Sequence, residues 1–403
     1  MLRVLWVVAL TAAAGVTYRV THDKLDVTAG LLFLAAVWAG LFAVVELAMR
    51  LLRCSTAQRA NVRTLVTTVG ILLIAVELVL RSGVGRYATY QEKNGRAYQR
   101  LPFYSATWFH VHNPHEEVNY SSPEFAFHRQ ANALGLSEAD ITPDKAAGEY
   151  RIVALGDSFT EGVGAPYDST WVKVMESEVA ARSPGRKVST INAGIAGSDV
   201  CAEYMLLREK LLSYNPDLVI VATNWTDVGD ITWRGGLNRF QPDGSVRFRH
   251  AAPSWEWLYG ISYLSRPLVH EVFGYGRWLT KRSLERSEQL AAVGDMRSAV
   301  DAFAALARER GFRLLFVLHP AQFEVETERY RAPFHRVVAD LKQMPGIEVL
   351  DVLTYWQERR IVTPENAAGF YWPVDSHHNP RGYAALGQAV ADQVIRLDLL
   401  RRP

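Results

Sequence analysis

The sequence has little cysteine and no excess of charge of either sign. Its 403 residues contain only Cys54 and Cys201, too few and too isolated for a disulfide framework or a cysteine metal site. Lysine and arginine number 44 and aspartate and glutamate 42, so the formal net charge is +2. No basic run interleaved with aromatic residues occurs. We therefore expect no nucleic-acid partner.

Long apolar stretches are confined to the first 80 residues. The stretch 27–49 is almost uninterrupted, and at about 1.5 Å per residue a helix of that length crosses a hydrocarbon core of about 30 Å. A second span runs over about 62–80. The shorter stretch 4–18 is either a transmembrane helix, which we favour, or the apolar part of a signal peptide. The pattern predicts a membrane anchor of two to three transmembrane helices over residues 1–81.

The loop between the spans 27–49 and 62–80 is basic. It carries Arg50, Arg53, Arg59 and Arg63 without an acidic residue. Because positive charge favours the cytoplasmic side of membrane helices, the chain after about residue 81 is expected outside the cytoplasm. For a bacterium this predicts a multi-pass protein of the inner (cytoplasmic) membrane whose soluble part faces the periplasm.

From residue 151 onward, short β-branched runs alternate with helical patterns, as in βαβ units and parallel sheets. The expected strands are 151–155, 187–191, 217–222, 313–318 and 347–351. Helices are expected near 169–182, 199–213, 290–310, 328–343 and 381–397. This predicts an α/β domain over 151–403, a doubly wound three-layer α/β/α sandwich with about five parallel strands. Its ligands should bind outside the carboxyl ends of the strands.

Residues 82–150 fit neither pattern and are expected to form a connector packed along the domain. His110, His112 and His115 in this segment suggest a metal site. However, no Asp, Glu or Cys stands at ligand spacing on a defined element, and Pro114 interrupts regular structure. We therefore expect a solvated loop without a metal.

A serine follows the first expected strand directly. The residues Gly156-Asp157-Ser158 stand where the strand ends and a helix begins, so free backbone N–H groups and the helix dipole can stabilise a negative oxygen there. Alternatively, Ser158 is only a helix cap. A phosphate-binding loop is disfavoured because no Lys-Ser or Lys-Thr follows the glycines.

Asp375 and His377 stand directly before the last expected helix. A histidine can take the proton of a serine hydroxyl and return it to a leaving group, while a carboxylate fixes the tautomer of the imidazole. In isolation, His377 and His378 are equally explained as polar loop residues. The occurrence of both motifs in one α/β domain favours a serine nucleophile.

These motifs resemble those of the SGNH/GDSL hydrolase family over about residues 120–397. Family members carry GDS after the first strand, a glycine after the second, an asparagine after the third and an Asp/His pair before the last helix. The matching pieces are GDSFTEG at 156–162, NAGIAG at 192–197 and DSHHNPRG at 375–382. SPEF at 122–125 and NALG at 132–135 resemble the segment that precedes the first strand in membrane-tethered members.

The resemblance implies a flavodoxin-like sandwich and a serine hydrolase that needs no metal or organic cofactor. It assigns Ser158 as nucleophile, His377 as base and Asp375 as the partner of His377. Gly197 is assigned as a backbone donor to the oxyanion. Many members have Asp-x-x-His, which would select His378, but the asparagine and glycine at +2 and +5 select His377.

The segment after the third strand departs from the family pattern. Members usually read Gly-x-Asn-Asp, whereas 222–227 reads ATNWTD, and counting along the strand puts Thr226 in the usual place of the asparagine. Asn224 and Thr226 would face the same side of an extended chain, so either reaches the oxyanion. We favour Asn224 because its amide is an N–H donor.

An insertion at about 228–286 carries ten aromatic residues between Trp233 and Trp278. It is interpreted either as a small helical subdomain or as a substrate lid that stacks on sugar rings, lies on the bilayer or faces a membrane partner.

The sequence favours an extracytoplasmic serine esterase or O-deacetylase that acts on acyl esters of a cell-envelope glycan or a lipid-linked substrate. The alternative is an O-acyltransferase that modifies an envelope polysaccharide together with a membrane-bound O-acyltransferase partner, because a sugar hydroxyl can replace water in the second step. A catalytically inactive scaffolding subunit of such an assembly is the third hypothesis.

Overall fold

A computed structural model describes residues 27–80, 111–242, 246–249, 263–264, 272 and 286–401. The described residues fall into two compact units. One contains two N-terminal helices and residues 263, 264 and 272, and the other contains a five-stranded sheet. The expected apolar stretch 4–18 and most of the aromatic insertion lie outside the described residues.

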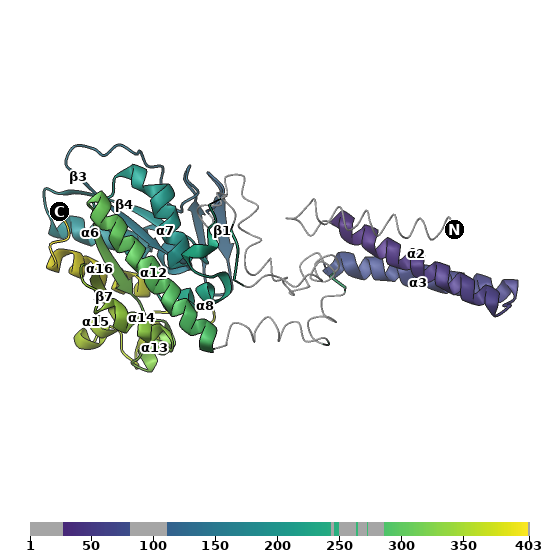
Figure 1. Ribbon diagram of the computed structural model, residues 1–403. Helices are drawn as coiled ribbons and strands as arrows, with labels where there is room; N and C mark the ends of the chain where they lie inside the picture. The colour runs from purple at the N-terminus through teal and green to yellow at the C-terminus, as the bar shows by residue number, and fades with distance from the viewer. Residues whose placement is uncertain are drawn as a thin grey trace. The chain divides into compact units, whose positions relative to one another are not determined.

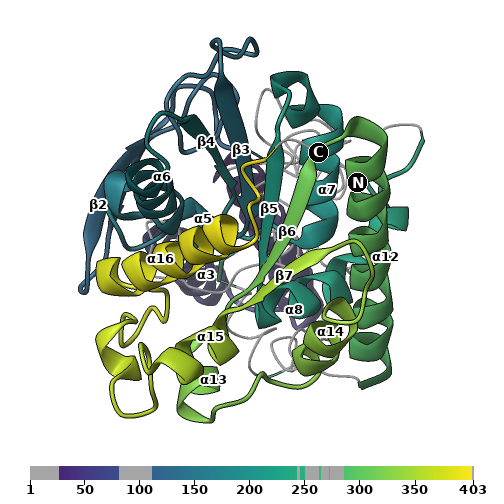
Figure 2. The same ribbon diagram turned by 90° about the vertical axis from the view of Figure 1, so that its left-hand side faces the viewer.

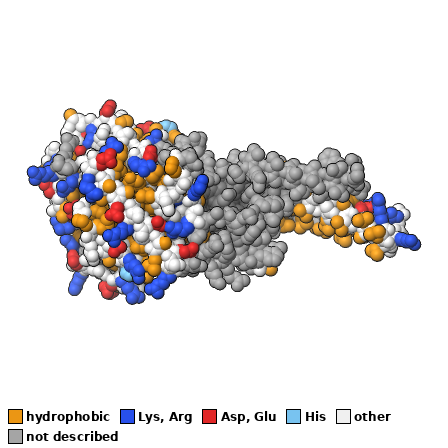
Figure 3. Space-filling model, in the orientation of Figure 1, with side chains coloured by type: hydrophobic (Ala, Val, Ile, Leu, Met, Phe, Trp, Pro, Cys, Tyr) orange, Lys and Arg blue, Asp and Glu red, His pale blue; other side chains and the backbone are white. Residues whose placement is uncertain are grey.

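Helices α2 (Val27–Leu51) and α3 (Thr56–Val79) pack against each other (Figure 1). Each is long and apolar enough to cross a membrane, and apolar side chains such as Val44 and Leu72 are exposed to 65% and 59%. Figure 3 shows this apolar surface, with basic side chains at the end of the hairpin. Two such helices near the N-terminus are membrane spans or a signal segment, and the multi-pass inner-membrane placement stays a prediction.

Two buried carboxylates organise this helical unit. Glu46 of α2 accepts a hydrogen bond from Arg63 of α3, and Arg50 lies 3.8 Å from it. Glu77 of α3 accepts from the backbone N–H groups of Tyr263 and Leu264 at 2.9 and 2.8 Å. This part of the aromatic insertion therefore packs with the N-terminal helices.

The second unit is built on five parallel strands, which confirms the expected doubly wound sandwich. The strands are β3 (Glu149–Gly156), β4 (Lys187–Gly194), β5 (Leu218–Thr223), β6 (Arg313–Leu318) and β7 (Glu348–Asp351). Their order in the sheet is β4-β3-β5-β6-β7. The chain runs outward from β3 to β4 and then returns to β5, so the order reverses beside β3. The crevice at the carboxyl ends of β3 and β5 is where such folds bind ligands.

Helices cover both faces of the sheet (Figure 2). They are α6 (Trp171–Arg182), α15 (Val352–Arg359) and α16 (Pro380–Arg396) on one face, and α7 (Val200–Glu209), α12 (Arg286–Arg310) and α14 (Phe334–Leu341) on the other. In β3, Ile152 and Ala154 belong to the core of the first face, and Val153 and Leu155 to that of the second. A strand buried on both faces needs a continuous apolar run, which the sequence 151–155 supplies.

Shorter elements connect these layers. They are α5 (Ser158–Glu161), α8 (Trp225–Arg234), α13 (Gln322–Glu326), and 3₁₀ turns at Tyr167–Ser169, Leu211–Tyr214, Leu237–Arg239 and Ala367–Gly369. The helix α8 begins at the carboxyl end of β5 and runs into the start of the expected aromatic insertion. It therefore brings part of the insertion to the edge of the sheet where ligands bind.

The expected connector contains a hairpin that the sequence pattern did not predict. Strands β1 (Glu117–Ser121) and β2 (Ala126–Gln130) pair in antiparallel register. Phe127 and Arg129 of β2 are buried, whereas their neighbours in the strand are exposed. Arg129 donates to the carbonyl oxygens of Gly162 and Ala165, which attaches the hairpin to the loop that follows α5.

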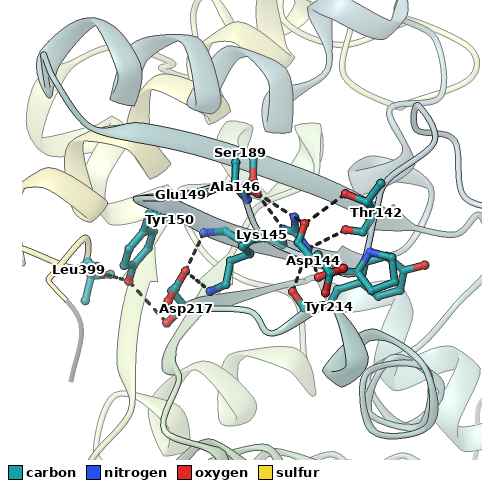
Figure 4. Close-up of polar contacts among 12 residues, drawn as sticks. Thr142, Asp144, Lys145, Ala146, Glu149, Tyr150, Ser189, Tyr214, Asp217 and Leu399 are labelled. Atoms are coloured by element: carbon teal, nitrogen blue, oxygen red, sulfur yellow. Dashed lines mark hydrogen bonds and ion pairs between the residues drawn. The ribbon is translucent and has the colours of Figure 1, made fainter.

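The chain just before β3 is attached to the opposite, amino end of the sheet (Figure 4). Lys145 donates to Asp217 at 2.6 Å. The buried Arg151 guanidinium donates at 3.0 Å to the carbonyl oxygens of Thr142, Pro143 and Tyr214. Because these contacts lie at the amino ends of the strands, they stabilise the fold and take no part in the site at the carboxyl ends.

Candidate active site

The structure brings together Ser158, His377 and Asp375. The Nε2 atom of His377 lies 2.7 Å from Ser158 Oγ, and its Nδ1 atom is hydrogen-bonded to Asp375. A carboxylate only accepts, so Nδ1 carries the proton and Nε2 is free to accept from the serine hydroxyl. This is the tautomer that a general base for Ser158 requires.

Ser158 is presented by a tight turn between β3 and α5. Asp157 caps the helix by accepting from the N–H of Phe159 at 2.9 Å. Gly156 has a φ of +156°, and a Cβ atom there would lie 2.1 Å from Oγ1 of Thr160. Gly194 at the end of β4 leaves room for the backbone of α5, because a Cβ atom there would lie 2.1 Å from the amide nitrogen of Glu161. The glycines expected from the sequence are therefore needed for close packing.

Asp375 and His377 lie in the loop before α16, and the segment before β3 holds that loop. Glu124 accepts from the backbone N–H groups of Val374 and Asp375 at 2.9 and 2.8 Å. The hydrogen bond from His377 lowers the pKa of Asp375 below its ordinary value, against a smaller effect of burial. The sequence analysis gave no role to Glu124, although it lies within the quoted SPEF piece.

His378 does not approach Ser158. It is fully buried, with its ring centroid 4.4 Å from that of Tyr371 and 5.4 Å from that of Tyr383. Burial lowers the pKa of His378 well below its ordinary value. Of the two adjacent histidines, His377 is the one placed to act on the serine.

The three residues line a cavity of about 480 Å³, called the first cavity below. Other described residues in its wall include Gly197, Trp225, Thr226, Asp230, Phe323 and Glu326. Asn224 is not one of these lining residues. The cavity opens at the carboxyl ends of β3 and β5, as expected for this sheet order.

The loop that carries Gly197 is held from two sides. Glu161 of α5 accepts from the N–H of Ala196 at 2.6 Å, and Arg234 of α8 donates to the carbonyl oxygen of Gly197 at 2.7 Å. Gly197 itself has a φ of +75°, which favours glycine. Its backbone is therefore fixed where it lines the cavity.

A buried ion-pair cluster lies behind the Gly197 loop. Asp199 accepts from Arg239 at 2.9 Å and from Arg234 at 3.2 Å, and all three residues are at most 3% exposed. Burial favours the neutral acid, but the charges of Arg239 and Arg234 keep the pKa of Asp199 below its ordinary value. None of these three residues was singled out from the sequence.

Asn224 lies behind the cavity wall. Its Oδ1 atom accepts from the N–H of Thr226 at 2.8 Å, which fixes the orientation of the amide. Its Nδ2 atom donates to Asp157 at 2.9 Å and lies 3.2 Å from Nε2 of His319. Both amide hydrogens therefore face buried partners. Thr226 lines the cavity, and its hydroxyl lies 2.7 Å from Asn224 Oδ1 and 3.1 Å from Asp157.

His319, directly after β6, is a further buried member of this group. Burial lowers the pKa of His319 to about 4, so the ring is neutral near pH 7 and Nε2 accepts from Asn224. The feature of the sequence that could have indicated His319 is its position at the carboxyl end of the fourth strand of the sheet.

The histidines of the segment before β3 are not all solvated. His112 is hydrogen-bonded at 2.8 Å to Glu161, which also accepts from the hydroxyl of Ser137, so the expectation of a solvated loop is wrong for His112. His115 is exposed, and His110 lies outside the described residues. Within the part of the chain that the structure describes, no cluster of three histidine, cysteine or acidic residues is arranged to hold a metal.

Comparison with known proteins places the fold in one family. Residues 154–385, more than half of the chain, match the model of the GDSL-like lipase/acylhydrolase family. No curated protein matches the sequence.

Several solved structures are similar to this chain. A lipase from a goat rumen metagenome has 16% identity and a TM-score of 0.39, covering 60% of this chain and 97% of that one. An acetylxylan esterase from Geobacillus stearothermophilus has 13% identity and a TM-score of 0.38, covering 61% and 94%. A lipase/acylhydrolase from Enterococcus faecalis has 15% identity and a TM-score of 0.36, covering 61% and 95%. On the match over 154–385, this chain belongs to the GDSL-like lipase/acylhydrolase family.

Proposed function

We propose that this protein is an extracytoplasmic serine esterase, specifically an O-deacetylase acting on acyl esters of a cell-envelope glycan or a lipid-linked substrate. The observation that carries the proposal is the hydrogen-bonded series Ser158–His377–Asp375 in the wall of the first cavity. The esterases and lipases of the family act on this class of bond.

In the first half of the reaction, His377 Nε2 takes the proton of Ser158 as Oγ forms a bond to the ester carbonyl carbon. Charge develops on the carbonyl oxygen, and the backbone N–H groups of Ser158 and Gly197 stabilise it. Collapse of this tetrahedral intermediate breaks the bond to the alcohol oxygen, which takes the proton from His377. The products are a free hydroxyl on the substrate and an acyl group on Ser158.

In the second half, His377 takes a proton from water as the water oxygen attacks the acyl carbon. The Ser158–acyl bond breaks, and Ser158 Oγ recovers its proton from His377. The second product is the carboxylic acid. Asp375 holds the imidazole in position and stabilises its positive charge in both halves.

The sequence favours Asn224 as the side-chain donor to the oxyanion, with Thr226 as the alternative. Thr226 lines the first cavity, whereas the amide of Asn224 faces Asp157 and His319. We therefore propose that the hydroxyl of Thr226, which donates to Asn224 Oδ1 at 2.7 Å without substrate, turns to the oxyanion at the cavity. Asn224 is the residue that positions Asp157 and the start of α8.

The apolar helices α2 and α3 and the basic residues between them are the basis for the proposed location of the protein. These features support an anchor in the inner membrane with the esterase outside the cytoplasm, and they suit an envelope substrate. A membrane-bound O-acyltransferase is the proposed partner if the acyl group goes to a sugar hydroxyl instead of water, since the same three residues serve transfer. The intact Ser158–His377–Asp375 geometry argues against an inactive scaffold.

The test uses purified full-length protein in detergent with 4-nitrophenyl acetate and with acetylated oligosaccharides. We expect acetate release that is lost in Ser158→Ala. Acetyl groups appearing on an added, unacetylated oligosaccharide would identify transfer. Equal acetate release by the wild type and Ser158→Ala, or none by the wild type with either substrate, would refute the proposal.

A further inference from the structure

A second cavity of about 540 Å³ adjoins the first one. Trp225, Thr226 and Asp230 line both cavities. Other described residues in the wall of the second cavity include Gly229, Trp233, Gln289 and Arg331. The wall that carries the site therefore continues past Thr226 along helix α8.

One face of α8 forms this continuous wall. Trp225, Gly229 and Trp233 follow one another at intervals of four residues, which places them on the same side of a helix. From Trp225 to Trp233 the helix rises about 12 Å, more than the length of one monosaccharide ring. A Cβ atom on Gly229 would meet nothing within 4 Å, so open space lies between the two indoles.

The aromatic boundary between the two cavities is held by a residue from the wall of each cavity. The Arg331 guanidinium lies 4.7 Å from the ring centroid of Trp225 and 5.5 Å from that of Phe323. The Trp225 and Phe323 rings meet edge to face at 5.8 Å. Such contacts restrict the indole of Trp225 to one orientation, so that it presents a rigid apolar surface.

The charge of the walls decides which ligands fit. The first cavity has the carboxylates Asp157, Glu326 and Asp375 in its wall, and no Lys or Arg among its described lining residues. Uronate or phosphate groups would be repelled there. A lipid tail in the second cavity would remove water from Asp230 and from the Arg331 guanidinium, which both lie in its wall. A neutral sugar suits both cavities, because its hydroxyl groups bond carboxylates and guanidinium groups while its C–H face packs on an indole.

We propose that the two cavities form one groove that binds a neutral glycan chain. The acylated sugar occupies the first cavity beside Ser158, and the following sugars lie along α8, with Trp225 and Trp233 as stacking surfaces and Gly229 as the gap between them. Asp230 and Arg331 bond the sugar hydroxyls. The inference rests on the proposed function and specifies its substrate as an uncharged chain of several sugars.

The test measures binding to full-length Ser158→Ala protein in detergent, so that no chemistry occurs. The probes are acetylated xylo- and manno-oligosaccharides of one to six sugars, with oligogalacturonate as the charged counterpart, in isothermal titration calorimetry. We expect affinity to rise at least tenfold from one sugar to four, and oligogalacturonate to bind at least tenfold more weakly. Affinity independent of length, or equal affinity for oligogalacturonate, would overturn the proposal.

Two substitutions locate the binding surface. In the Ser158→Ala background, Trp233→Ala removes the far stacking surface, and Gly229→Leu fills the gap. Each should abolish most of the tenfold gain with length. Tyr120→Ala is the matched control, because Tyr120 is an aromatic residue exposed to 41% on β1, outside both cavities, and it should preserve the gain. A gain that survives both groove substitutions would refute the groove.

Turnover by the wild type separates this inference from the proposed function. If the wild type cleaves acetyl esters but binding does not depend on chain length, the groove is wrong and the esterase stands. If binding depends on length and on Trp233 but the wild type cleaves no ester, the groove stands and the esterase is wrong.

Discussion

The two walls of the first cavity are built differently. The nucleophile wall (Ser158, His377 and Asp375) is a short series of hydrogen bonds in which the histidine and aspartate side chains remain 19% and 20% exposed. The backing wall (Gly197 and Thr226, with Asn224 directly behind them) rests on buried polar contacts to residues from other elements.

The contacts that hold the backing wall come from several distant parts of the chain. Asp199 and Arg234 secure the Gly197 loop, and Asp157 and His319 surround Asn224. Groups that react need access to substrate and water, whereas groups that only position others are most effective when buried and fully bonded. Substitutions in the nucleophile wall should therefore remove activity and spare stability, and substitutions behind the backing wall should lower stability as well.

The largest effect is expected in the nucleophile wall. Ser158→Ala and His377→Ala should each lower kcat on an acetyl ester by about 10⁴-fold or more, because residues that act as one unit fail together. The melting temperature should change little, since both side chains are near the surface of the cavity. Steady-state kinetics and thermal unfolding measure the two quantities.

His378→Ala is the control for this prediction. It should destabilise the protein, because a buried ring is removed from the core, while the folded fraction keeps kcat within about tenfold of the wild type. A loss of activity in His378→Ala that matches His377→Ala would contradict the assignment of the base.

The next effect concerns the cluster behind Gly197. Asp199→Asn removes the buried negative charge that pairs with Arg234 and Arg239, which should lower the free energy of unfolding by about 3–5 kcal/mol. Arg182→Gln, which breaks a half-exposed pair with Asp392, should cost less than about 1 kcal/mol. Denaturant unfolding of both variants makes the comparison, and equal costs would show that the cluster is not what holds this wall.

Substitutions of Thr226 and of Asn224 should differ in their effects on kcat and on the melting temperature. Thr226→Val keeps the shape and removes the hydroxyl, so kcat should fall by about 10²-fold, with KM and the melting temperature little changed. Thr226→Ser should restore most of the activity. Asn224→Ala should lower both kcat and the melting temperature, because the helix cap and the contacts to Asp157 and His319 are lost. If Asn224→Ala lowers kcat alone, its amide is the oxyanion donor, as the sequence suggested.

The smallest effect is a dependence of stability on pH. Burial acts to lower the pKa of His112, but the hydrogen bond and charge of Glu161 raise it above the ordinary value. A raised pKa stabilises the fold fully below the unfolded value of about 6.5 and loses this contribution as pH rises through the folded value. The melting temperature of the wild type should therefore decline more between pH 6 and pH 9 than that of His112→Gln. Parallel profiles would contradict a charged His112–Glu161 pair.

The sequence predicted the five strands of the sheet and the residues that meet at Ser158. Parallel strands buried on both faces are continuous apolar runs, and the reacting residues lie in short motifs directly beside strand and helix ends. The β1–β2 hairpin was missed, although Ala126–Gln130 alternates, because one of its two inward side chains is the charged Arg129. Its buried position depends on the carbonyl oxygens of a distant loop.

The residues of the backing wall were harder to predict from the sequence, because they also depend on contacts between distant parts of the chain. Asp199 and Arg234 lie far apart in the sequence, as do Asn224 and His319, and each pair meets only through the fold. The preference for Asn224 over Thr226 was based on the donor strength of an amide. That argument took no account of Asp157 and His319, which face both hydrogens of the amide.

The central claim is that Ser158 is a nucleophile activated by His377, and covalent labelling tests it most directly. Full-length protein is treated with a fluorophosphonate probe, digested and analysed by mass spectrometry. The account predicts one adduct, on Ser158, whose formation slows by orders of magnitude in His377→Ala and is little changed in His378→Ala. No adduct on Ser158, or labelling at an equal rate in His377→Ala, would contradict it.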